Sequence, residues 1–196
     1  SRLRVPDDVD ERVAELNLPA RFLLAIGDLE PHRGTDHLIR ALRSLDDDVA
    51  LLLVGPEPKD KAIAAFVAAE GVSAERVRCL GTLSNDDLSV VFDRAAAFVY
   101  ANLDAGFGMP VLEALSFGVP VVHSDAPALL ELAADAGIVV EREPAGAYSD
   151  ALAEGIGRIL NDSALAERLF YSGQDRARAF NWRTSAEKVW QLHADL

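Results

Sequence analysis

The stretch from Asp104 to Val122 reads D-A-G-F-G-M-P-V-L-E-A-L-S-F-G-V-P-V-V. Pro110 suits the first turn of a helix, because its missing N–H would have no partner there and its φ is already helical. Gly118 suits the left-handed residue that ends such a helix, and Pro120 prevents its continuation. The stretch therefore predicts a glycine-rich turn, a short helix that ends near Phe117, and a β-branched strand.

The start of this predicted helix has the features of an anion site. Its first N–H groups have no partner within the helix, and the helix dipole favours negative charge there. Gly106 and Gly108 allow close backbone approach because they carry no Cβ. The Glu113 side chain, one turn inside, tilts back toward this end and could accept both hydrogen bonds of a ribose diol. A nucleoside diphosphate fits this combination; an ordinary helix, with Glu113 complementing its dipole, is the alternative.

The rest of the chain alternates short apolar runs with amphipathic segments. Apolar runs predict strands at 21–27, 49–55, 76–81, 96–100, 119–123 and 137–141. Helical spacing predicts helices at 35–45, 59–70, 84–95 and 126–133, and three more pieces from Pro144 onward. This order is typical of an α/β, Rossmann-like parallel sheet with helices on both faces, whose ligands lie at the carboxyl ends of the strands.

The domain organisation follows from this pattern. Residues 21–180 form the predicted Rossmann-like domain, residues 1–20 a leading linker segment, and residues 181–196 a C-terminal helix. The 196 residues carry a net charge of −13, so the chain lacks the basic face that non-specific nucleic-acid binding needs. No apolar run approaches the ~20 residues that span a bilayer. Cys79 is the only cysteine, which fits a reducing compartment, and we expect a cytoplasmic protein.

Two further strand-end turns are expected at the same edge of the sheet. G-D-L-E-P-H-R-G (27–34) supplies glycines and one cation, and L-G-T-L (80–83) could offer backbone groups to a base. With the 104–122 stretch, they resemble the C-terminal, nucleotide-sugar-binding domain of GT-B retaining glycosyltransferases of family 4, or group 1. That family carries G-R-L-x-x-x-K-G, a later strand-end G-x-x, and E-G-F-G-x-P-x-x-E-A followed by G-x-P-V-V, in this order.

The resemblance implies a retaining hexosyltransferase that takes its sugar from a UDP- or GDP-sugar without a metal or other cofactor. An N-terminal domain of the same protein would bind the acceptor, carry catalytic groups that this sequence does not reveal, receive the C-terminal helix and provide any peripheral membrane attachment. The isolated domain would bind nucleotide and transfer little. Carried over position by position, the donor-binding residues are Gly27, Arg33, Gly34, Gly81, Thr82, Leu83, Gly106, Phe107, Gly108, Met109 and Glu113.

Within this set, Arg33 replaces the phosphate-binding lysine of the family, and Glu113 matches the glutamate expected on the ribose. Two other positions depart from the pattern. Ala105 stands where a glutamate normally faces the donor sugar, and Asp28 stands where an arginine is expected. Reversing a charge ~4 Å from a phosphate is worth several kcal/mol at an effective dielectric of ~20.

These departures leave a degenerate, non-catalytic partner or regulatory subunit open as an alternative, with a sugar-nucleotide epimerase of related architecture as a lesser one. Asp104 is a candidate to replace the missing glutamate, although neighbours in an extended segment point opposite ways. His123 reads either as a donor contact or as a polar residue that ends its strand. The donor sugar, the base and the acceptor do not follow from the sequence.

Overall fold

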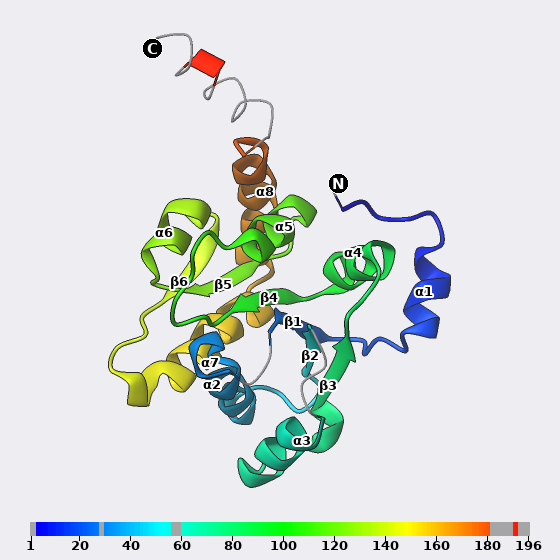
Figure 1. The fold of residues 1–196 in the computed structure, drawn as a ribbon, viewed down its shortest axis with the longest axis vertical. Helices are drawn as coiled ribbons and strands as arrows, with labels where there is room; N and C mark the ends of the chain where they lie inside the picture. The colour runs from blue at the N-terminus through cyan, green and yellow to red at the C-terminus, as the bar shows by residue number, and fades with distance from the viewer. Residues whose placement is uncertain (1–2, 28–29, 56–59, 181–189, 192–196) are drawn as a thin grey trace.

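A computed structural model describes residues 3–27, 30–55, 60–180 and 190–191 of the chain. Its strands form one six-stranded sheet in the order β3-β2-β1-β4-β5-β6, and every neighbouring pair is parallel (Figure 1). The strands are β1 (Phe22–Ile26), β2 (Ala50–Val54), β3 (Val77–Gly81), β4 (Ala97–Tyr100), β5 (Val121–Ser124) and β6 (Gly137–Val140). The predicted parallel sheet is confirmed. The strand order reverses between β1 and β4, which is where sheets of this kind bind ligands.

Helices cover both faces of this sheet (Figure 1). One apolar core contains residues of α2 (Thr35–Ala41), α3 (Asp60–Ala69) and α7 (Tyr148–Asn161). The other contains residues of α4 (Asn85–Arg94), α5 (Met109–Phe117) and α6 (Pro127–Ala133). The long α8 (Ser163–Arg178) follows α7 and packs along α5. Single 3-10 turns connect the elements: η1 (Pro31–Arg33), η2 (Leu42–Ser44), η3 (Ala74–Arg76) and η4 (Ala145–Ala147).

The central strand β1 explains why the sequence reads as apolar without alternation. Leu23 and Ala25 join the core on one face, whereas Phe22 and Leu24 join the core on the other. Because successive side chains of a strand point to opposite faces, a strand that is covered on both sides needs an apolar residue at every position.

Capping residues bound α4 and α5, and the glycine at the end of α5 is the one that the sequence predicts. The Ser84 hydroxyl accepts a hydrogen bond from the Asp87 N–H at 3.1 Å and caps α4. Gly118 ends α5 with a left-handed φ of +75°. The first cap sets where α4 begins, and the second sets where α5 ends.

Residues 1–20 contain a helix that the apolar pattern does not reveal, α1 (Val9–Glu15). None of its residues is fully buried, and Val9 and Val13, which are partly buried one turn apart, are too few to make a clear helical pattern. It lies beside α4, where the Arg12 Nη1 donates to the Asp87 carboxylate at 2.7 Å (Figure 1). The predicted C-terminal helix at 181–196 lies outside the described residues, except for residues 190–191, which are helical.

Candidate functional site

The glycine turns that the sequence singles out lie along one edge of the sheet. Gly27 follows β1, Gly81 ends β3, and the turn that contains Gly106 and Gly108 follows β4. Two backbone hydrogen bonds link the first part of this edge, from the Gly27 N–H to the Val54 carbonyl at 3.0 Å and from the Gly55 N–H to the Gly81 carbonyl at 3.1 Å. All these turns therefore stand at the carboxyl ends of parallel strands, as predicted.

Arg33 folds back over the end of β1. A Cβ placed on Gly27 would lie 3.7 Å from both the Cβ and the Cδ of Arg33. The Arg33 Nε is buried and has no hydrogen-bond partner among the residues described, and Arg33 forms no ion pair with them. Burial raises the pKa of Tyr100, the last residue of β4, and the charge of Arg33 acts against that rise. The edge thus holds a cation that the described chain does not neutralise.

The turn that carries Arg33 is joined directly to the segment that follows β4. The Leu103 N–H donates to the His32 carbonyl at 2.8 Å. Gly34 has a left-handed φ of +68°, and a Cβ on it would lie 2.1 Å from the Ala101 carbonyl oxygen. Only glycine satisfies both the φ and the close approach at this position. The two turns on either side of the switch point are therefore held together by backbone contacts.

The start of α5 is set by Gly108, its N-cap, with a left-handed φ of +89°. A Cβ at Gly108 would lie 2.6 Å from the Leu129 Cδ2 of α6, so the turn rests closely on that helix. The neighbouring Phe107 and Met109 side chains are 51% and 44% exposed. A Cβ on Gly106 would have no atom within 4 Å. The glycine turn is thus packed against α6 on one side and exposed on the other.

Glu113 lies one turn inside α5 and is half-buried. Burial raises the pKa of its carboxyl group. Its carboxylate has no hydrogen bond or ion pair with any described residue. Partial desolvation of a carboxylate without a partner is unfavourable, and hydrogen bonds from a ligand would offset that cost.

The remaining predicted residues divide between the surface and the core. Thr82 is exposed just after β3, whereas Leu83 packs against the apolar core on the α5 face. Asp104 is exposed and Ala105 is partly buried. Asp28 lies outside the described residues.

His123 does not reach the surface. It is 0% exposed on β5, and its Nδ1 lies 2.8 Å from the Ser124 carbonyl as a donor. Burial lowers its pKa, and its Nε2 has no partner among the described residues. A Cβ on Gly137 would lie 2.8 Å from the His123 ring, so β6 covers it closely. His123 is a buried strand residue, as the second of the two interpretations has it.

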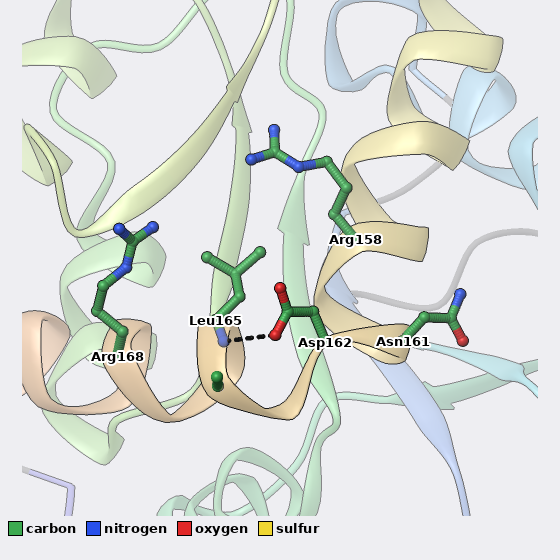
Figure 2. Close-up of a pocket in the computed structure, with 6 residues that line it drawn as sticks. Arg158, Asn161, Asp162, Leu165 and Arg168 are labelled. Atoms are coloured by element: carbon green, nitrogen blue, oxygen red, sulfur yellow. Dashed lines mark hydrogen bonds between the residues drawn. The ribbon is translucent and has the colours of Figure 1, made fainter.

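A hollow of about 460 Å³ lies away from this edge, at the turn between α7 and α8, and we call it the α7–α8 hollow. Its lining residues are Arg158, Asn161, Asp162, Ala164, Leu165 and Arg168 (Figure 2). Arg21, which directly precedes β1, donates to the Leu160 carbonyl at 3.0 Å. The hollow therefore stands at the amino ends of the strands, opposite the glycine turns.

The sequence did not single out Arg142, which follows β6. Its guanidinium pairs with the Asp125 carboxylate and donates to the Leu103 carbonyl. Leu103 and Arg142 are 39 residues apart, so no local pattern connects them. The order of strands β4, β5 and β6 is the one signal that could have brought them to the same edge.

Neither a metal site nor a membrane span is found in the parts of the chain that the structure describes. No three His, Cys, Asp or Glu side chains in those parts gather as metal ligands would. None of the helices described there is both long and apolar enough to cross a bilayer.

Comparison with known proteins decides the family. Residues 7–176 match the family model of glycosyl transferases group 1. The chain belongs to the glycosyl transferase group 1 family. This confirms the resemblance, and the GT-B Rossmann-like fold is shared with solved relatives.

Three relatives illustrate the extent of the match. O-antigen chain mannosyltransferase B of Escherichia coli is 31% identical over 165 residues, which are 82% of this chain and 42% of that protein. Sucrose-phosphate synthase from Thermosynechococcus elongatus superposes with a TM-score of 0.82 at 29% identity, over 98% of this chain and 49% of that one. HepE of Anabaena, solved with UDP and glucose, gives a TM-score of 0.84 at 22% identity, over 98% of this chain and 53% of that one. The chain spans about half the length of each of these three relatives.

Proposed function

We propose that this chain binds a nucleoside diphosphate sugar and presents it for retaining transfer of a hexosyl group. One observation carries the proposal: the same sheet edge holds a buried guanidinium nitrogen, Nε of Arg33, and a half-buried carboxylate, that of Glu113, and the described chain leaves both without a partner. A nucleoside diphosphate supplies what each lacks, an anion for the first and two hydroxyl donors for the second.

In this proposal, different residues at the carboxyl edge of the sheet bind different parts of the donor. Arg33 and the first-turn N–H groups of α5 hold the diphosphate and stabilise the negative charge that develops on it as the sugar leaves. Glu113 accepts hydrogen bonds from the ribose hydroxyls, and the Gly81–Leu83 turn faces the base. The exposed Phe107 and Met109 flank the sugar. The positive charge of Arg33 makes a resident metal unnecessary for this step.

The comparisons support this reading of the site. Solved complexes of HepE contain UDP and UDP-glucose, and the E. coli relative is named as a mannosyltransferase. A uridine or guanosine diphosphate sugar is accordingly the class of donor we propose. The acceptor and the catalytic groups would be contributed by a further, N-terminal region of the same protein, because the matched relatives are about twice as long as this chain.

Titration calorimetry of the chain with UDP and GDP tests the proposal. Glu113→Gln should weaken binding of the preferred nucleotide by roughly 1.5–3 kcal/mol, the scale of a hydrogen bond to a charged group. Glu154→Gln is the matched control, since Glu154 is an exposed glutamate on α7, across the sheet. An equal dissociation constant in both variants would show that Glu113 only complements the dipole of α5.

The alternative is a degenerate partner that no longer transfers sugar, and Ala105 is the observation that favours it. A transfer assay of the full-length protein across a panel of donor sugars separates the two. An active enzyme with an unusual donor should be impaired by Ala105→Glu, because the larger acidic side chain would enter the sugar pocket. A decayed site should show no turnover, and Asp28→Arg should then tighten nucleotide binding. We favour the active enzyme because a cation at position 33, the glycine turn with Gly108, and Glu113 are all present.

A further inference from the structure

Three consecutive carbonyl groups lead from β4 toward the glycine turn, and each accepts a hydrogen bond from a distant side chain. The Tyr148 hydroxyl donates to the Ala101 carbonyl at 3.0 Å. The Ser124 hydroxyl donates to the Asn102 carbonyl at 2.6 Å. Nη1 of Arg142 donates to the Leu103 carbonyl. The segment is therefore fixed residue by residue, although it is an irregular loop.

The last of these bonds stands closest to the glycine turn and is reinforced by an ion pair. The Nε of Arg142 donates to Oδ1 of Asp125, and the Arg142 backbone N–H lies 3.4 Å from the same oxygen. Burial would raise the pKa of Asp125, but the Arg142 guanidinium holds it below the usual range. One guanidinium thus ties the residues that follow β5 and β6 to Leu103.

The opposite side of Leu103 is tied to the Arg33 turn. Its N–H donates to the His32 carbonyl at 2.8 Å, while its carbonyl accepts from Arg142. Both polar backbone groups of Leu103 are therefore occupied, one by each side of the switch point. Gly106 and Gly108 follow within five residues, so the position of Leu103 sets where the glycine turn stands relative to Arg33.

We propose that Arg142 is a positioning residue for the donor: with Asp125 it fixes Leu103, and so holds the glycine turn at the separation from Arg33 that a diphosphate spans. This inference rests on the proposed function. Arg142 does not touch the donor. It acts by ordering the loop before binding, which removes that ordering cost from the binding free energy.

The matched control is another arginine that donates to backbone carbonyls, at the other edge of the sheet. Nε of Arg76 donates to the Val49 carbonyl at 3.0 Å, and its Nη2 donates to the Asp46 carbonyl at 2.8 Å. Arg142→Met and Arg76→Met remove the same kinds of bonds. The two variants should lose similar thermal stability, and only the first should affect the glycine turn.

Two measurements on the full 196-residue chain decide the matter. Amide hydrogen exchange without nucleotide should quicken at residues 103–108 in Arg142→Met and stay unchanged there in Arg76→Met. Calorimetry should show the preferred nucleotide, UDP or GDP, binding about 5- to 30-fold more weakly to Arg142→Met than to Arg76→Met. Arg142→Lys should recover part of both losses, since an ammonium group can still pair with Asp125. Asp125→Asn, which leaves Arg142 in place, should shift both readouts in the same direction by less, and it replaces Arg142→Met if that variant does not fold.

Unchanged exchange at 103–108 in Arg142→Met would overturn the inference, as would faster exchange without any loss of nucleotide affinity. If the unaltered chain binds neither UDP nor GDP, the proposed binding of a nucleoside diphosphate sugar is wrong. The exchange measurement then still decides whether Arg142 orders the loop, because it needs no ligand.

Discussion

Arginines without a partner among the described residues stand at both ends of the strands, and the two places differ in how deeply the guanidinium groups are buried. Arg33 stands at the carboxyl ends of the strands with a buried Nε, beside turns whose backbones touch. Arg158 and Arg168 stand at the amino ends, exposed on the rim of the α7–α8 hollow, where Figure 2 shows them flanking Leu165. The hollow has a volume of about 460 Å³, yet none of its lining residues has a buried polar atom without a partner.

This contrast shows which features distinguish a ligand site in a sheet of this kind. The hollow lies at the turn between α7 and α8. The one carboxylate that lines it, that of Asp162, already accepts a hydrogen bond from the Leu165 N–H at the start of α8. At the glycine edge, close contacts between turns are combined with polar groups left free. Such a combination costs stability in the empty protein, and a ligand is the simplest reason for it.

The largest effect should come from filling the backbone contact at Gly34. Gly34→Ala would place a Cβ 2.1 Å from the Ala101 carbonyl oxygen at a φ of +68°. We expect a loss of about 3 kcal/mol or more in the free energy of unfolding, from the left-handed backbone together with the overlap. Denaturant unfolding measures it.

Gly71→Ala is the control for this effect, because Gly71 has a φ of +69° and a Cβ there would meet no atom within 4 Å. It should cost only about 1 kcal/mol, the left-handed backbone term alone. Equal losses of unfolding free energy in the two variants would mean that the backbone near Gly34 and Ala101 can shift to accept a Cβ, and that the contact is not tight.

The next effect compares the unpaired arginines themselves. Arg33→Met should weaken binding of UDP or GDP by roughly 1.5–3 kcal/mol, because a charge-assisted hydrogen bond to the diphosphate is lost. Arg158→Met and Arg168→Met should leave the dissociation constant unchanged. Calorimetric titration of all three variants tests this. If Arg158→Met or Arg168→Met weakened nucleotide binding as much as Arg33→Met does, the nucleotide would bind, or be attracted electrostatically, at the amino ends of the strands.

Much of this arrangement could be predicted from the sequence, since it depends on local signals. Apolar runs without alternation predicted strands covered on both faces, helical spacing predicted α4, and Gly118 predicted the end of α5. Parallel strands then placed Gly27, Gly81 and Gly108 at one edge without any knowledge of side chains.

What could not be predicted depends on contacts between distant residues. The three side chains that donate to the 101–103 carbonyls lie 47, 22 and 39 residues from their acceptors. They are a tyrosine, a serine and an arginine, and no sequence pattern around them predicts such bonds. The burial of His123 depends on how closely β6 approaches at Gly137. Helix α1 went unrecognised because it is short and buries none of its residues fully, with only Val9, Arg12 and Val13 partly covered.

A smaller effect should appear when pH is lowered, through Glu113. Because burial raises its pKa in the folded state, the folded protein binds more protons here than the unfolded chain does between the two pKa values. This group alone therefore makes the protein more stable as pH falls through that window, and less stable as pH rises. Nucleotide binding should change in the opposite direction, since a protonated carboxyl accepts fewer strong hydrogen bonds.

We expect binding to weaken by ~1 kcal/mol, about fivefold, as Glu113 becomes protonated, the difference between a hydrogen bond to a charged and to a neutral group. Calorimetry from pH 7 downward measures it, with Glu113→Gln as the variant that should lose this pH dependence. The Glu154→Gln variant should follow the unaltered chain. A dissociation constant that responds identically in Glu113→Gln would assign the titration to the phosphates or to another residue.

The smallest effect concerns the α7–α8 hollow and asks whether its carboxylate does anything beyond ending a turn. Asp162 Oδ1 accepts from the Leu165 N–H at 3.0 Å and caps α8 (Figure 2). Asp162→Ala should therefore cost ~1 kcal/mol or less in the free energy of unfolding, whereas Asp162→Asn should cost almost nothing, because asparagine caps a helix as well as aspartate does. Neither variant should alter nucleotide affinity. Unfolding curves and a titration of the same samples test both statements.

If Asp162→Asn destabilised the chain as much as Asp162→Ala, the negative charge of Asp162 would itself matter, through the dipole of α8 or through Arg158 and Arg168. The hollow would then be an electrostatic feature and not merely a capped turn. If Asp162→Ala tightened nucleotide binding, the arginines it flanks would be competing for the anion, and the contrast between the two edges would fail.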